Sequence, residues 1–161
     1  NNAARYNFGI NGFVSWKGVD LSFLMQGVAK RDAWIGGEIM FPHAGTFSTF
    51  LSHQMDYWTP ENPNAYYGRI YQNAQYAHSV NQWTQTKFLS NAAYLRMKNI
   101  TLGYNLPKSL CQKMSLIGAK VFFSGENLFT ISSLLPGIDP EALSWQYPMT
   151  ATYSFGVSIN L

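Results

Sequence analysis

The residues of this chain that could do chemistry are few and scattered. His43, His53 and His78 lie in one long segment, at spacings that match no metal-ligand motif. Cys111 is the single cysteine, so no internal disulfide can form. Four acidic residues stand near prolines, where capping or turn roles are expected: Asp56, Glu61, Asp139 and Glu141. We therefore expect no enzyme activity, no bound metal and no cofactor.

Four tryptophans fall in segments without strand periodicity: Trp34, Trp58, Trp83 and Trp145. Flat aromatic rings in loops either stack on sugar rings and contact partner proteins, or pack together as the core of an ordered loop. The sequence leaves both roles open.

Three of the four charged residues in the predicted strands are expected to come together. Arg96 and Lys98 belong to one strand and Glu126 to the next, and all three are expected on the polar side of the sheet. Lys98 is expected to lie near Glu126. Such a cross-strand pair would contribute about 0.2–1 kcal/mol, as a structural contact rather than a substrate contact.

The elements that must position these residues are β-strands. Large apolar residues alternate with small or polar ones over residues 6–16 and again over 152–161, to the last residue. Both lengths suit a tilted membrane-spanning strand of about 9–11 residues. The residues predicted to face lipid are Tyr6, Phe8, Ile10, Val14, Trp16, Tyr153, Phe155, Val157, Ile159 and Leu161.

Three further strands are predicted at 21–28, 94–104 and 119–129. The apolar residues of 94–104 change parity, which predicts a β-bulge near Lys98 and Asn99. Residues 17–20 predict a tight turn, and 107–114 a short helix beginning at Pro107. Residues 30–92, with a possible short helix at 48–57, and residues 131–149 are predicted to be long loops.

Composition favours an all-β membrane protein. Aromatic residues make up 16% and charged residues only 12%, yet no run of 18 apolar residues occurs. The net charge of +3 comes from scattered residues, which argues against nucleic acid as a partner. A soluble, secreted carbohydrate-binding β-sandwich and a passive porin are the alternatives.

Five antiparallel strands are too few to close a bacterial barrel. We therefore expect residues 1–161 to be the C-terminal segment of a barrel domain, with the signal peptide and the rest of the barrel encoded upstream. The alternation of short and long connections places the long loops outside the cell and the last strand's end in the periplasm.

Several segments resemble, in order and spacing, the SusC/RagA family of TonB-dependent outer-membrane transporters of Bacteroidota. The main signature is YLRMKNITLGYNLP at 94–107. The others are RYNFG at 5–9, SWKGVD at 15–20, WTPENPN at 58–64, VFFSGENLF at 121–129, GIDPE at 137–141 and YP at 147–148. One departure is Leu161, where such barrels often end in Phe.

The resemblance implies a 22-stranded, multi-pass barrel in the outer membrane with an N-terminal plug that TonB acts on. It also implies a SusD-like surface lipoprotein as a lid, contact with outer-membrane lipid, and active import of oligosaccharides or peptides. The plug and the TonB-contacting motif are not recognisable in residues 1–161. The four loop tryptophans are then candidates for contact with substrate or lid, beside their alternative role as a loop core.

Overall fold

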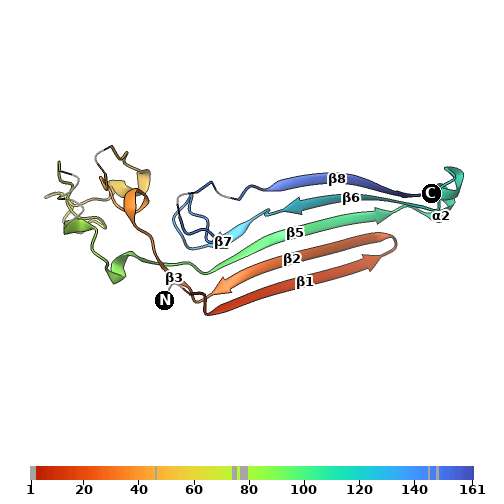
Figure 1. Ribbon diagram of the computed structural model, residues 1–161, viewed down its shortest axis with the longest axis horizontal. Coiled ribbons are helices and arrows are strands. Elements are labelled where there is room, and N and C mark those ends of the chain that lie inside the picture. Colours follow the sequence, from red (N-terminus) through yellow and green to blue (C-terminus); the bar gives the residue numbers. More distant parts are fainter. Residues whose placement is uncertain (1–2, 46, 74–75, 77–79, 145, 148) are drawn as a thin grey trace.

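A six-stranded antiparallel sheet dominates the computed structural model, which describes residues 3–45, 47–73, 76, 80–144, 146–147 and 149–161. Its main strands are β1 (Tyr6–Trp16), β2 (Val19–Ala29), β5 (Tyr94–Asn105), β6 (Gly118–Glu126) and β8 (Thr152–Asn160), which neighbour one another in that order. The short β7 (Thr130–Ser132) pairs with the start of β5. The sheet is a long open meander (Figure 1).

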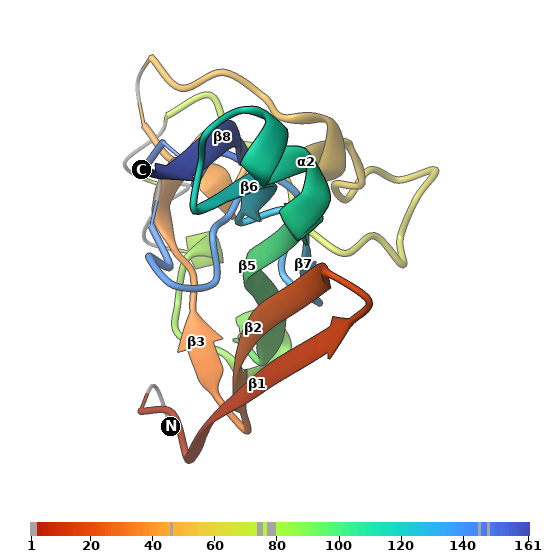
Figure 2. The same ribbon diagram turned by 90° about the vertical axis from the view of Figure 1, so that its right-hand side faces the viewer.

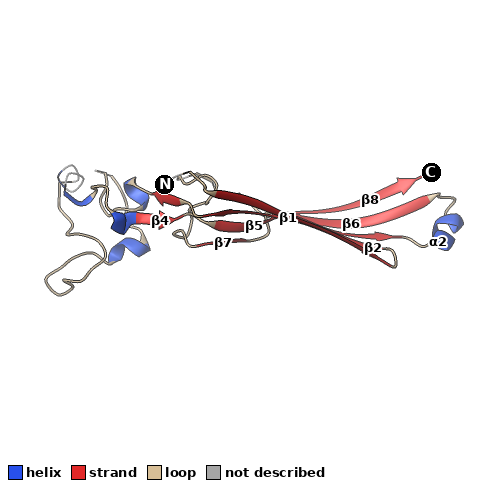
Figure 3. Cartoon of the chain, turned by 90° about the horizontal axis from the view of Figure 1, so that it is seen from below, coloured by secondary structure: helices blue, strands red, loops and turns tan. Residues whose placement is uncertain are grey.

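The two ends of the sheet differ. One end holds the β1–β2 turn, α2 (Lys108–Lys113) and the C-terminus, and we call it the turn end (Figures 1 and 2). The other end, the loop end, carries the long connections, which gather beyond the strands (Figure 3). No helix among the described residues is long and apolar enough to cross a membrane.

The turn end is tighter than expected. β2 begins at Val19 rather than 21, because Lys17 and Gly18 alone make the turn, both with positive φ (47° and 86°). The short helix begins at Lys108 rather than at Pro107, which is its N-cap residue with a ψ of 141°.

The predicted β-bulge is confirmed. Leu24 lies opposite Asn99 whereas Met25 lies opposite Met97, so Lys98 is the extra residue on β5. The bulge turns Met97 and Ile100 to the same face of the sheet despite their odd spacing.

The strand expected at 119–129 is shorter, which corrects that prediction. β6 ends at Glu126, because Asn127 adopts a positive φ of 51°. Asn127 N–H donates to Lys98 O (3.1 Å), and Met97 N–H donates to Phe129 O (3.1 Å), before β7 resumes the pairing at Thr130. A kink at 127–129 therefore divides the predicted strand.

The two faces of the sheet have opposite chemistry. Residues opposite each other in an antiparallel ladder share a face, so the register assigns every side chain. One face, the apolar face, carries Tyr6, Phe8, Ile10, Val14, Trp16, Val19, Leu21, Phe23, Met25, Leu95, Met97, Ile100, Leu102, Tyr104, Val121, Phe123, Ile131, Tyr153, Phe155, Val157 and Ile159.

This apolar face is uncovered. Its described strand residues include no charged side chain, and small residues such as Gly12, Gly27 and Ala119 fill the remaining positions. Trp16 and Phe155 are 68% and 74% exposed. The opposite, polar face carries the strand charges Asp20, Arg96, Lys120 and Glu126.

The loop end has its own small core. The two-stranded sheet of β3 (Asp32–Trp34) and β4 (Leu89–Asn91) leads into it, and the 3-10 turns Gly37–Ile39, Ser52–Met55 and Thr86–Phe88 shape it. Its buried residues are Ile35, Ile39, Met40, Phe41, Tyr67, Phe88 and Ile138. The helix expected at 48–57 is only the single turn Ser52–Met55, which the buried Gln54 anchors by donating to Glu38 O (2.7 Å).

Candidate functional site

An ion-pair cluster lies on the polar face near the loop end. Arg96 is 3% exposed, and its Nη2 lies 2.9 Å from Asp139 Oδ2. Its Nη1 lies 3.2 Å from Glu141 Oε1, and its Nε donates to Thr130 Oγ1 (2.7 Å). Lys98 Nζ lies 2.7 Å from the same Glu141 oxygen. The cluster ties the 133–149 connection to β5.

Asp139 also shapes its own loop. Its Oδ1 accepts the N–H of Glu141 (2.8 Å), and its Oδ2 accepts the N–H of Met149 (3.3 Å). Burial alone would raise the pKa of Asp139, but these N–H groups and Arg96 outweigh burial, so its pKa is lowered. The carboxylate therefore stays ionised, both as a turn residue and as the partner of a buried cation.

Lys98 and Glu126 lie close in the register, as expected, but Lys98 forms its ion pair with Glu141 instead of Glu126. Glu126 lies opposite Asn99 and Thr152 in the register, while Lys98 reaches Glu141. The cause is the bulge at Lys98 together with a loop carboxylate that strand pairing alone could not anticipate.

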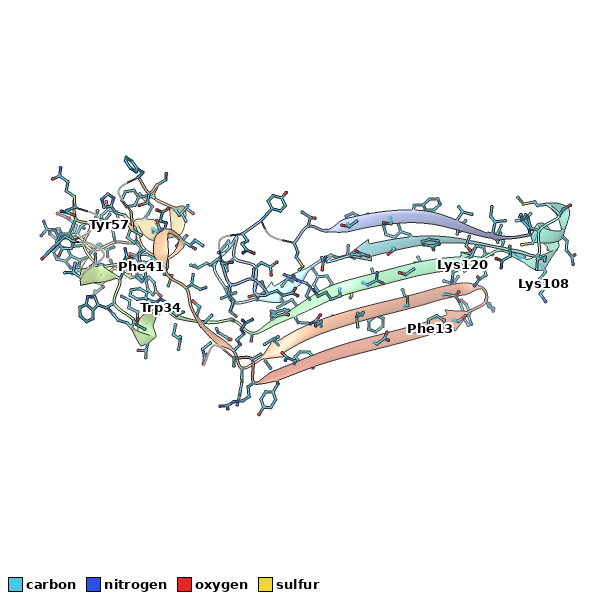
Figure 4. All side chains as sticks on the ribbon, viewed as in Figure 1. Phe13, Trp34, Phe41, Tyr57, Lys108 and Lys120 are labelled. Atoms are coloured by element: carbon cyan, nitrogen blue, oxygen red, sulfur yellow. The ribbon has the colours of Figure 1, made fainter. Side chains whose placement is uncertain are left out.

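Trp34 belongs to the packed core of the loop end. Its ring lies 6.0 Å from Phe41 and 6.2 Å from Phe88, centroid to centroid, and Phe41 and Phe88 meet edge-to-face at 4.8 Å. Trp34 and Phe41 lie among densely placed side chains (Figure 4). For Trp34, the structure matches the self-packed alternative.

Trp58, which is 36% exposed, lines a cavity of about 490 Å³ at the loop end. Tyr67, Arg69, Tyr71 and Lys87 are its other large lining residues. A short bridge frames it, because Trp58 N–H donates to Tyr67 O (3.0 Å) and Tyr67 N–H donates to Asp56 O (2.9 Å). We call it the Trp58 cavity.

Asp56 holds this frame in place. Its Oδ2 accepts the N–H of Tyr66 and its Oδ1 accepts from Asn62 Nδ2, both at 3.0 Å. These two hydrogen bonds lower the pKa of Asp56. Burial raises the pKa of Tyr67 to about 12, so its hydroxyl stays protonated.

The remaining predicted residues lie apart. Trp83 is 68% exposed, and Trp145 and His78 fall outside the described residues. His53 Nε2 lies 2.7 Å from Ile39 O, and His43 Nε2 lies 3.3 Å from Gln72 O. Within the described part of the chain, no group of three or more His, Cys, Asp or Glu side chains could hold a metal ion.

The chain has relatives among receptors, although no family model matches it. TonB-dependent receptor P3 of Formosa agariphila is 28% identical over 141 residues, 85% of this chain and 13% of that protein. TonB-dependent receptor P26 of the same organism is 29% identical and covers 95% of this chain and 16% of that protein. TonB-dependent receptor SusC of Bacteroides thetaiotaomicron is 39% identical over 80 residues, 45% of this chain and 8% of that protein.

Solved structures agree. The structure of the RagAB peptide transporter superposes with a TM-score of 0.69 at 27% identity, over 95% of this chain and 16% of that chain. The RagAB peptide importer in its closed-closed state gives a TM-score of 0.64 at 25% identity, over 92% of this chain and 17% of that chain. The chain is a partial homologue of SusC/RagA-type TonB-dependent receptors.

The chain spans only a small part of its relatives' length, 8% to 16% of the three receptors. The open all-β sheet is accordingly a fragment of a larger barrel. The relatives are receptors and transporters rather than enzymes.

The roles of some residues in these two sites were not predicted from the sequence. Asp139 and Glu141 were expected only in turn roles, but both pair with the buried Arg96. The available signal was that a buried strand arginine needs an acidic partner, and this chain has few acidic residues. No sequence pattern predicted that Tyr67, Arg69 and Lys87 would line a cavity with Trp58, because the segment around them has no periodicity.

Proposed function

We propose that the chain forms the C-terminal wall segment and outer loops of a TonB-dependent importer in the outer membrane. The observation that supports this most strongly is the apolar face, which extends over all the long strands without a charge among the described residues. A charged side chain on this face would cost several kcal/mol in the hydrocarbon of the bilayer. The strands β1, β2 and β5, at 11 to 12 residues, are long enough to cross the bilayer.

The strand edges support a larger barrel. β1 and β8 each have a neighbour on one side only within this chain. In lipid, every unpaired backbone group costs several kcal/mol, so further strands must pair with both edges. The turn end would face the periplasm and the loop end the outside, as short and long connections do in such barrels.

In this proposal the chain supplies wall and capture surface. Substrate, an oligosaccharide or a peptide, binds at the loop end beneath a SusD-like lipoprotein. TonB acts on a plug outside residues 1–161, and the substrate then passes to the periplasm. Trp58, Trp83 and Trp145 are the proposed substrate or lid contacts, and Arg96, Lys98 and Glu126 line the lumen.

Lipid quenching tests the orientation of β8. In the complete protein carrying this segment, with Cys111 replaced by Ala, a fluorophore is attached at Phe155→Cys or at Ser154→Cys before refolding into vesicles. Nitroxide lipids should quench the probe at 155 strongly and the probe at 154 weakly. Equal quenching, or a compact monomer in water without detergent, would contradict the proposal and favour the soluble sandwich.

Energy dependence separates an importer from a porin. Uptake of labelled oligosaccharides and peptides is compared in cells with and without TonB. Loss of uptake without TonB is expected, whereas undiminished uptake would identify a passive pore.

A further inference from the structure

The Trp58 cavity carries positive charge that no acidic residue in the described part of the chain pairs with. Arg69 and Lys87 line it, both are exposed, and none of its lining residues is acidic. Among the described residues, no carboxylate lies within ion-pairing distance of either cation. In a chain with so few charges, two cations at one cavity that have no ion-pair partner in the described part of the chain favour the binding of an anion there.

Aromatic rings hold these cations at the cavity. Lys87 Nζ lies 4.8 Å from the centroid of the Tyr66 ring and 5.6 Å from that of Phe88, while the Arg69 guanidinium lies 5.9 Å from that of Tyr71. Such contacts place a cation and leave its N–H groups free to donate. Asp56, which acts on Lys87 only through space, already uses both oxygens for Tyr66 and Asn62.

We propose that the Trp58 cavity binds an anionic saccharide, with its carboxylate or sulfate group on Arg69 and Lys87 and a sugar ring against Trp58. Arg69 can grip a planar carboxylate or a sulfate through two parallel N–H donors, and Lys87 adds a point charge. Trp58 offers an apolar surface to the C–H face of a pyranose.

The backbone groups that join Trp58 to Tyr67 are not available to a peptide ligand. A peptide that binds as an added strand needs a free row of N–H and C=O groups. Here Trp58 N–H and Tyr67 O are bonded to each other, and Tyr67 N–H is bonded to Asp56 O. At Trp58 and Tyr67, therefore, the side chains rather than these backbone groups are available to a ligand, which suits a ligand of rings and charged substituents.

The inference rests on the proposed importer function and names its substrate class. It is tested with the complete protein in detergent, by calorimetric titration with four probes: an oligogalacturonate, a sulfated oligosaccharide, a neutral maltooligosaccharide of equal length and an oligoglutamate peptide. At least one anionic saccharide should bind, more weakly as salt rises, and more tightly than the neutral sugar or the peptide.

Three variants and one control locate the binding. Arg69→Ala and Lys87→Ala should each raise the Kd for the anionic saccharide about tenfold, and Trp58→Ala should raise it as well. Lys108→Ala removes the same charge from an exposed position on α2, at the opposite end of the molecule (Figure 4), and should leave the Kd unchanged.

The outcomes are separable from those for the importer. Suppose that lipid quenching and TonB-dependent uptake are observed as expected. If no anionic saccharide then binds, or if its Kd is unchanged in the Arg69→Ala and Lys87→Ala variants, this inference alone is overturned. Tighter binding of the peptide would overturn it too. Equal quenching at positions 154 and 155 together with TonB-independent uptake would instead overturn the proposed importer function.

Discussion

The ring of Phe23 on β2 lies over Gly12, its direct partner on β1. A Cβ added at Gly12 would collide with the end of this ring. Phe8 covers Gly27 in the same way on the same pair of strands. Aromatic rings that fill the space over cross-strand glycines pin the register of the two strands.

Gly12→Ala should therefore weaken the β1–β2 pair. The ring of Phe23 must leave its position, at a cost of about 1–3 kcal/mol, typical of overpacking. Urea unfolding of the refolded protein measures the change. Gly9→Ala is the matched control on the same strand, because its added Cβ would meet only Met25 O at an ordinary 3.7 Å. Equal effects of both substitutions would refute the explanation.

Asp139→Asn should loosen the 133–149 connection. Removing one partner of a buried ion pair costs about 3–5 kcal/mol, and Glu141 should recover part of that for Arg96. Protease added outside the cell should then cut this connection faster. Adding Arg96→Met should restore some protection, since no buried cation is left unpaired, and a purely additive double variant would argue against the pair.

Acid should release the same connection. The pKa of Asp139 is lowered in the folded protein, so its contribution to stability is complete above the ordinary value of 3.8 and is lost as pH falls through the folded value. Protease susceptibility of the wild type should rise in that acid range. The Asp139→Asn protein should lack this component, and an identical pH profile in both would assign the release to another group.

Lys98→Glu should disturb the cluster far more than Glu126→Gln. The new carboxylate would face Glu141, whose oxygen lies 2.7 Å from the native Lys98 Nζ, whereas Glu126 lies between Asn99 and Thr152. Folding yield in the outer membrane, read from heat-dependent gel mobility, compares the two. A larger defect in Glu126→Gln would restore the pairing predicted from sequence.

Strand positions and the bulge could be predicted because both depend on a period of two, which is local. The parity change between Met97 and Ile100 revealed the bulge directly. The end of β6 could not be predicted, because the positive φ of Asn127 breaks the ladder without breaking the apolar pattern.

The sites depended on contacts that sequence spacing does not encode. Asp139 reaches Arg96 from 43 residues away through an irregular loop, and the Trp58 cavity brings Arg69 and Lys87 together within a segment that has no period. Such positions follow from loop packing, which local pattern does not determine.

The edges of β1 and β8 that have no neighbouring strand in this chain affect how residues 1–161 behave in isolation. Each edge strand presents a row of unpaired backbone N–H and C=O groups beside the apolar face. Isolated copies in water would pair edge to edge and aggregate. The further strands of the proposed barrel would therefore prevent this aggregation as well as close the barrel.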